Sequence, residues 1–204
     1  MSKAFALALW LGLSALAAHP LAAAEAGDAV FTERGPWDLD DRRLEWQMTV
    51  EGPAAEGFQP VADGKVTLSE AIDPSDQQPV LRLTQETEAR TRQVGPFPIS
   101  AGDPVLIFFL EQTARDMAAL TGGSPHYIRN RLKDILFRGG EIAQADGTTT
   151  ATFKPFADDP NANRMNGFQT LTLTFVMKDP AEPIRELKAE TEAAPGYRNQ
   201  LVLQ

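Results

Sequence analysis

The 204-residue sequence contains no cysteine, only two histidines and only two tyrosines. Without cysteine, the chain can form no disulfide, no thiolate metal site and no cysteine nucleophile. Basic residues are also scarce, since 19 Lys+Arg stand against 28 Asp+Glu and give a formal net charge of −9. Because a nucleic-acid binder needs a basic face to neutralise phosphates, we expect no nucleic-acid partner. The 43% apolar content is enough to bury a core and predicts a globular domain.

The first 24 residues have the features of a secretory signal peptide. Lys3 supplies the positive n-region, Ala4–Ala18 is almost wholly apolar, and Ala22–Ala24 offers a small-residue cleavage site. A retained membrane anchor is the alternative, but the apolar run is short for a span of about 20 residues. We therefore predict a signal peptide over 1–24 and a single exported domain over 25–204. That domain is expected to be periplasmic or secreted, and not membrane-spanning after cleavage.

Loss of this leader would leave His126 as the one histidine, with 18 Lys+Arg against 28 Asp+Glu and a net charge of −10. A single histidine excludes zinc sites that need two or more imidazole ligands. Any metal would then be held by oxygen atoms, which favours calcium-like ions.

The loop 157–167 is the one segment with calcium-like spacing. It carries oxygen ligands at alternate positions, namely Asp159, Asn161 and Asn163. However, Arg164 and Thr170 stand where a calcium loop needs glycine and a bidentate glutamate. The sequence therefore predicts neither a metal site nor a cofactor.

Alternating apolar residues predict strands in several segments on both sides of a central region. These segments are 44–50, 65–69, 80–92, 148–153, 168–178, 184–192 and 200–203. Asp63-Gly64 predicts a turn before the second segment, and Gly95–Pro98 is expected to break the sheet after the third. Most connections are too short for parallel crossovers, so the strands should pair antiparallel.

The central region, 103–138, has the pattern of a helical hairpin. Asp103-Pro104 and Ser124-Pro125 each place a capping residue before a proline at the first helical position. Glycine pairs at 122–123 and 139–140 end the two helices. On the first helix, Arg115 and Asp116 are expected to lie off the apolar stripe. The predicted fold class is α+β, a mostly antiparallel sheet of about seven strands with an inserted helical hairpin packed on its apolar face.

Positive charge is concentrated at the start of the second helix, where free backbone N–H groups can also bind an anion. The candidate ligand-binding residues there are Ser124, His126, Tyr127, Arg129 and Lys133. The alternative is a basic outer helix face that pairs with acids of the sheet, such as Glu86 and Glu88.

The run Val105–Leu110 contains two further candidates, Phe108 and Phe109, for contact with an apolar ligand. Six consecutive apolar residues exceed the needs of one helix stripe. Either the helix is buried on several sides, or one side lines an apolar pocket. For the buried case, we expect a core centred on Leu110, Met117, Leu132 and Phe175.

These features favour a non-catalytic periplasmic binding, carrier or envelope-assembly protein that holds an apolar or anionic ligand at the helical hairpin. Its partners would be an apolar small molecule, a lipid or an envelope protein. The layout of leader, sheet, helical insert and sheet is similar to that of periplasmic carriers of lipids or lipoproteins, a likeness of architecture alone. The alternative is an exported hydrolase that uses His126, beside Ser124, or the paired carboxylates Glu86 and Glu88.

Overall fold

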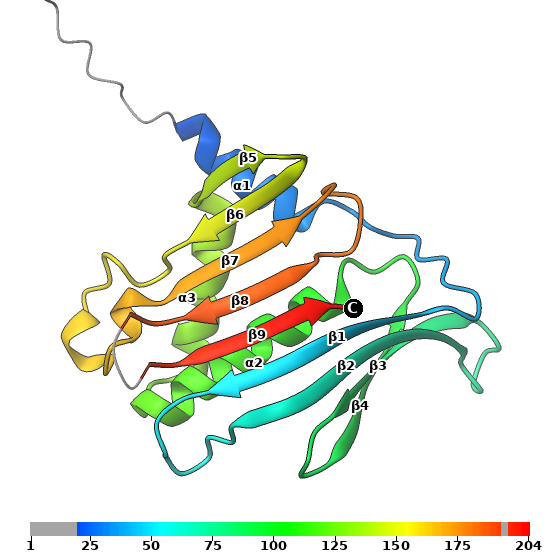
Figure 1. Ribbon diagram of the computed structural model, residues 1–204, viewed down its shortest axis with the longest axis horizontal. Helices are drawn as coiled ribbons and strands as arrows, with labels where there is room; N and C mark the ends of the chain where they lie inside the picture. The colour runs from blue at the N-terminus through cyan, green and yellow to red at the C-terminus, as the bar shows by residue number, and fades with distance from the viewer. Residues whose placement is uncertain (1–19, 193–195) are drawn as a thin grey trace, which may run out of the picture.

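A computed structural model describes residues 20–192 and 196–204 of the chain. Within these residues, nine strands form one antiparallel sheet in the order β4-β3-β2-β1-β9-β8-β7-β6-β5 (Figure 1). The strands are β1 (Arg43–Glu51), β2 (Val61–Ile72), β3 (Pro79–Glu86), β4 (Thr91–Pro98), β5 (Glu141–Ala145), β6 (Thr148–Phe153), β7 (Thr172–Met177), β8 (Glu186–Glu190) and β9 (Arg198–Leu203). The pairing of β1 with β9 joins two meanders, β1–β4 and β5–β9. The predicted α+β class with an antiparallel sheet is confirmed.

Two local features raise the strand count from about seven to nine. The segment 80–92 is interrupted at Thr87, whose backbone N–H donates to the carbonyl of Arg90 at 2.9 Å, so it forms two strands. The second of these, β4, continues through Gly95–Pro98, which was expected to break the sheet. Proline is tolerated there because β4 is an edge strand.

The other additional strand, β5, comes from a hairpin that the sequence analysis did not predict. Asp146 and Gly147 both have positive φ, 51° and 72°, as the tight turns between antiparallel strands require. The turn predicted at Asp63-Gly64 is absent from this described segment, because β2 runs continuously through both residues. Pairing of β1 with β2 is irregular close to Gly64, between Met48 and Val50.

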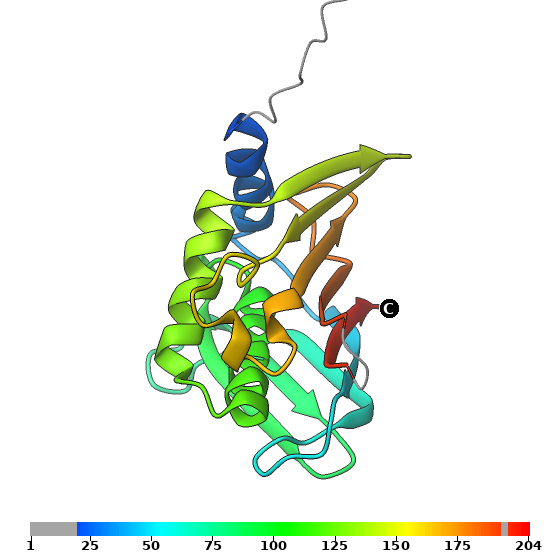
Figure 2. The ribbon, with the colours of Figure 1, turned by 90° about the vertical axis from the view of Figure 1, so that its left-hand side faces the viewer.

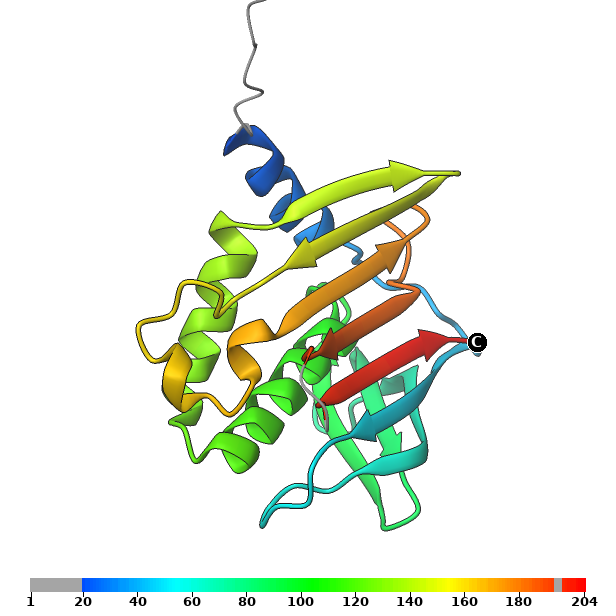
Figure 3. The same ribbon diagram turned by 60° about the vertical axis from the view of Figure 1, so that its left-hand side comes forward.

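The predicted helical hairpin is present as α2 (Pro104–Thr121) and α3 (Pro125–Arg138). The Asp103 carboxylate accepts hydrogen bonds from the amides of Val105 and Leu106 at 2.9 and 3.1 Å and caps α2. Gly122 ends α2 in the left-handed conformation, with φ 68°. Both helices pack on one side of the curved sheet (Figures 2 and 3).

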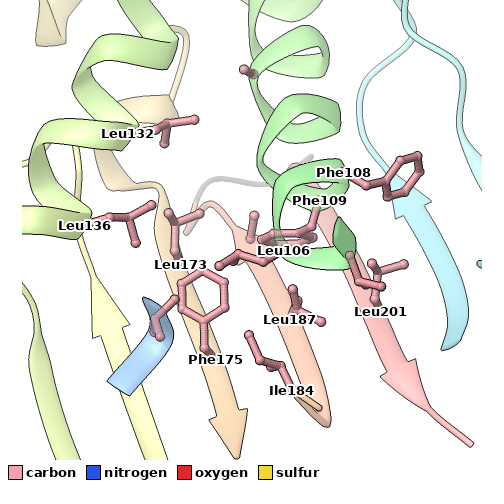
Figure 4. Close-up of a cluster of buried hydrophobic side chains, with 14 of the residues drawn as sticks. Leu106, Phe108, Phe109, Leu132, Leu136, Leu173, Phe175, Ile184, Leu187 and Leu201 are labelled. Atoms are coloured by element: carbon pink, nitrogen blue, oxygen red, sulfur yellow. The ribbon is translucent and has the colours of Figure 1, made fainter. Parts of the chain in front are cut away.

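The core lies between these helices and the inward-facing residues of the strands. Alternate side chains of β7 and β8 are buried, among them Leu173, Phe175 and Leu187. Figure 4 shows them pointing toward residues of α2 and α3, including Leu106, Phe109, Leu132 and Leu136. The period-two pattern of the strands therefore provides one wall of a continuous apolar core.

A further helix, α1 (Pro20–Phe31), packs against α3, β5 and β6. Of the predicted signal peptide, residues 1–19 lie outside the described residues, and 20–24 begin this helix. Ala26 and Val30 are fully buried. The buried guanidinium of Arg34 donates to the carbonyl of Val30 at 2.9 Å and lies 3.8 Å from the Asp103 carboxylate. Among the helices of the described residues, none is both long enough and apolar enough to cross a membrane.

Candidate functional site

The two phenylalanines proposed as ligand contacts lie in the core. Phe109 is fully buried, and its ring meets that of Phe175 edge-to-face at a centroid distance of 6.0 Å. Phe108 is also buried, on the same helix. The inward side of α2 is therefore solid at this level. Leu110, expected at the centre of the core, is only partly buried, because it lies on the outer side of α2.

That outer side contains a groove of about 340 Å³ between α2, α3 and the end of α1. Phe31 and Phe137 stack across it with ring centroids 4.8 Å apart, and Ile107 is 50% exposed. The groove also brings together two predicted ligand residues, Arg129 and Lys133. Arg129 is already engaged, because its Nε lies 2.9 Å from the Glu111 carboxylate.

The polar side chains at the start of α3 contact neighbouring groups of the protein. The Ser124 hydroxyl accepts from the amide of Tyr127 at 3.5 Å, and exposed His126 lies 3.1 Å from the side-chain amide of Asn130. The Tyr127 hydroxyl donates to Asp159 at 2.7 Å. Ligand binding by these residues stays a prediction.

Asp159 is the first of the three oxygen ligands proposed in the loop 157–167. Its carboxylate is inaccessible to solvent and forms an ion pair with Arg131 at 3.0 Å. Burial alone would raise the pKa of Asp159, but hydrogen bonds from Tyr127 and Asn161, together with Arg131, hold it below its usual value. These contacts use the carboxylate to anchor the loop to α3. Over the described part of the chain, no three acidic or histidine side chains gather as a metal would need.

The carboxylates of Glu86 and Glu88 do not share a strand face, as the sequence analysis expected. Strand β3 ends at Glu86, and Glu88 lies in the turn that follows. The Glu88 carboxylate accepts a hydrogen bond from the backbone amide of Asp63 at 2.9 Å. Separation of the two residues by the turn removes the geometric basis for a paired-carboxylate site.

A cavity of about 520 Å³ lies between the C-terminal half of α2 and the β1–β4 half of the sheet, and we call it the α2 cavity. Its volume falls within the range of about 300–1,000 Å³ that is common for small-molecule sites. Its lining comes from β1, β3, α2, the segment before β2 and the β3–β4 turn. The lining residues are Met48, Gly57, Gln59, Pro60, Val61, Gln85, Thr87, Glu88, Ala89, Arg90, Gln112, Arg115 and Asp116.

Positive charge gathers at the α2 cavity. Arg90 and Arg115 line it, and Arg92 stands opposite Gln85 in the β3–β4 pairing, so both side chains share the face toward α2. Burial, together with the guanidinium groups of Arg115 and Arg90, lowers the pKa of Arg92. Within the described residues, none of these three arginines forms an ion pair with a carboxylate. Three mutually repelling cations at one cavity favour the binding of an anion.

The floor of the α2 cavity, in contrast, contains a buried acidic residue. Asp116 is only 4% exposed, and its two oxygens accept hydrogen bonds from Tyr197 at 2.9 Å and Gln112 at 2.7 Å. Burial raises its pKa to about 6 despite both hydrogen bonds and the nearby Arg115. Asp116 was expected to lie off the apolar stripe of α2, but it is buried, next to Met117.

Gln85 is the second buried polar residue of the cavity floor. It is 5% exposed, and its amide nitrogen contacts the sulfur of Met48 at 3.6 Å. Its amide oxygen is buried without a hydrogen-bond partner among the described residues. An unpaired buried acceptor costs about 1–3 kcal/mol, so this atom is a site where a ligand donor would be stabilised.

The sequence held one signal for this cavity. Gln85 has the same parity as Leu81 and Leu83 and is therefore a polar residue on an otherwise apolar strand face. The convergence of Arg90 and Arg92 with Arg115 has no sequence signal, because it depends on how β4 folds back beside α2. A search of protein-family models and a search of curated proteins found no match to this chain.

Proposed function

We propose that this protein is a non-catalytic binding protein that holds a small anionic ligand in the α2 cavity and acts in the periplasm or outside the cell. The observation that carries the proposal is the convergence of Arg90, Arg92 and Arg115, without carboxylate partners in the described structure, on one cavity. Arg115 donates to the amide oxygen of Gln112 at 3.1 Å, and in an acidic protein guanidinium groups would more readily pair with surface acids. Their grouping beside a cavity therefore supports recognition of a ligand anion.

The lining also supports binding in preference to catalysis. Its guanidinium groups and side-chain amides recognise charge and hydrogen-bonding pattern. Its two carboxylates, Glu88 and Asp116, already accept hydrogen bonds from groups of the protein. The apolar contribution comes from Met48, Pro60 and Val61, so a short hydrocarbon segment can accompany the charge. We accordingly place the anionic ligand that the sequence suggested beneath α2, not at the start of α3.

Titration calorimetry with succinate and glycerol 3-phosphate tests this assignment. Replacement of Arg115 by methionine should lower the affinity about tenfold or more, because a charge-assisted hydrogen bond contributes about 1.5–3 kcal/mol. Arg129→Met is the matched control, since Arg129 lies on the outer face and pairs with Glu111. It should leave the affinity within about twofold.

Opposite behaviour of the two variants would assign the anion to the start of α3. If neither these two anions nor any other small anion shows saturable binding to the folded protein, the proposal fails. Raised salt should weaken binding to the unsubstituted protein more than to Arg115→Met, because fewer charges contact the anion in the variant.

A further inference from the structure

The α2 cavity differs in character between its mouth and its floor. Arg90 and Arg115 are exposed, whereas Gln85 and Asp116 are 5% and 4% exposed. The solvent side therefore carries charged donors together with the one carboxylate of Glu88, which already accepts from the Asp63 amide, and the other acceptors lie at depth. A ligand that fills the cavity meets both.

The buried acceptors have unused capacity. Each Asp116 oxygen accepts one hydrogen bond, from Tyr197 or from Gln112, and a carboxylate oxygen can accept two. The Gln85 amide oxygen accepts none within the described residues. A simple anion would engage the arginines but would leave the Gln85 oxygen unpaired and the further acceptor capacity of Asp116 unused, and its charge would be repelled by ionised Asp116.

We propose that the ligand of the α2 cavity is a zwitterion, with a carboxylate or phosphate held by Arg90, Arg92 and Arg115 and an ammonium group held by Asp116 and Gln85. This inference rests on the proposed binding function and names its ligand class. An ammonium group has three donors, enough to serve both acceptors at once. It also supplies the cation that a buried carboxylate needs to remain ionised.

Matched ligands that differ in one group test the ammonium end. Calorimetric titration would compare 4-aminobutanoate, 4-hydroxybutanoate and butanoate, and would compare O-phosphoethanolamine with ethyl phosphate. The amino compound of at least one series should bind about tenfold tighter than its partner without nitrogen, and the series that shows this identifies the anionic group. Amino acids from glycine to 6-aminohexanoate would then give the separation of the two charges.

Two variants test whether residues of the cavity floor cause the preference for amino compounds. Asp116→Asn should reduce the amino preference to about twofold or less, while butanoate or ethyl phosphate binds as tightly as before or tighter, because the variant no longer repels the anion. Gln85→Met, of similar volume, should reduce the preference in part and gives an independent reading if the first variant folds poorly. Glu111→Gln is the control, because it removes an acid from the outer side of the same helix.

The outcomes separate this inference from the proposed function. Equal binding of amino and non-amino anions, or tighter binding of the hydroxy compound, would overturn the zwitterion and leave the anion site in place. An amino preference that survives both floor variants would also overturn it. Failure of every anion to bind the folded protein would overturn the proposed function itself.

Discussion

The two halves of the sheet have the same alternating strand pattern but differ in what lies between the strands and the covering helices. In β5–β9, the inward residues meet Phe109, Leu132 and other apolar side chains and form a solid core (Figure 4). In β1–β4, most inward residues are also buried in the core, but at Gln85 and Arg92 the face borders a cavity. The covering helix explains the difference, because α2 changes from apolar residues at Val105–Leu110 to the mainly polar segment Glu111–Asp116. Alternating strand residues thus form one wall of the interior, and the residues of the facing helix determine whether a cavity is left beside that wall.

The largest effect on stability is expected in the core beneath the β5–β9 half of the sheet. Phe109→Ala should lower the free energy of unfolding by about 3–5 kcal/mol, through lost transfer energy and the cavity left against Phe175. Leu110→Ala on the next residue is the comparison, and it should cost less because Leu110 is partly exposed. Urea denaturation of both variants measures this. Equal losses would show that the outer side of α2 is as tightly packed as the inner side.

The sequence predicted the secondary-structure elements better than it predicted the cavity. Period-two strands and two capped helices followed from local chemistry, which is why β7, α2 and α3 were placed correctly. The split at Thr87 was missed because it lies in a polar segment with no strong turn signal. The β5 hairpin was missed although Asp146-Gly147 is a typical hairpin turn, and the same dipeptide at 63–64 predicted a turn that β2 does not make. Asp116 was placed on the wrong side, since a charged residue next to an apolar stripe is normally solvated. Its burial depends on Tyr197, 81 residues away along the chain.

The next effect belongs to the cavity half and depends on pH. The pKa of Asp116 is about 6 in the folded protein and 3.8 as its ordinary value. The folded state therefore binds more protons between these values, and stability from this group falls as pH rises from about 4 to 6. A difference of about two pKa units corresponds to about 3 kcal/mol. Asp116→Asn removes this penalty, so the variant should gain about that much relative to the parent between pH 4 and 7.

Denaturant melts at several pH values measure this gain. Other carboxylates contribute equally to parent and variant, so the difference isolates Asp116. Glu111→Gln is the matched comparison, because it makes the same kind of change on the outer side of α2, where the carboxylate pairs with Arg129. A constant difference for Asp116→Asn would mean that the cavity floor is well solvated.

A smaller loss of stability is expected where α1 packs against α3, at the β5–β9 half of the sheet. A Cβ atom added at Gly27 would lie 2.4 Å from the backbone carbonyl oxygen of Leu136, so Gly27→Ala must push α1 away from α3. Overpacking of this kind costs about 1–3 kcal/mol. Gly102→Ala is the matched control, since its added Cβ meets nothing within 4 Å. Thermal melts should show a lower midpoint for the first variant alone, and equal midpoints would mean that α1 packs loosely.

The smallest effect is expected at His126, on the exposed start of α3 and outside both the core and the α2 cavity. Its ring contacts only the Asn130 amide among the side-chain hydrogen bonds of the described residues. His126→Ala should therefore change the free energy of unfolding by less than about 0.5 kcal/mol and ligand affinity by less than about twofold. An imidazole used in acid–base chemistry would behave differently, because its removal costs about 10²–10⁴ in rate. Calorimetry with the ligand that binds best, and melts of the same sample, separate these cases. A loss of tenfold or more in affinity by a folded variant would place the binding site at the first turn of α3 and not in the α2 cavity.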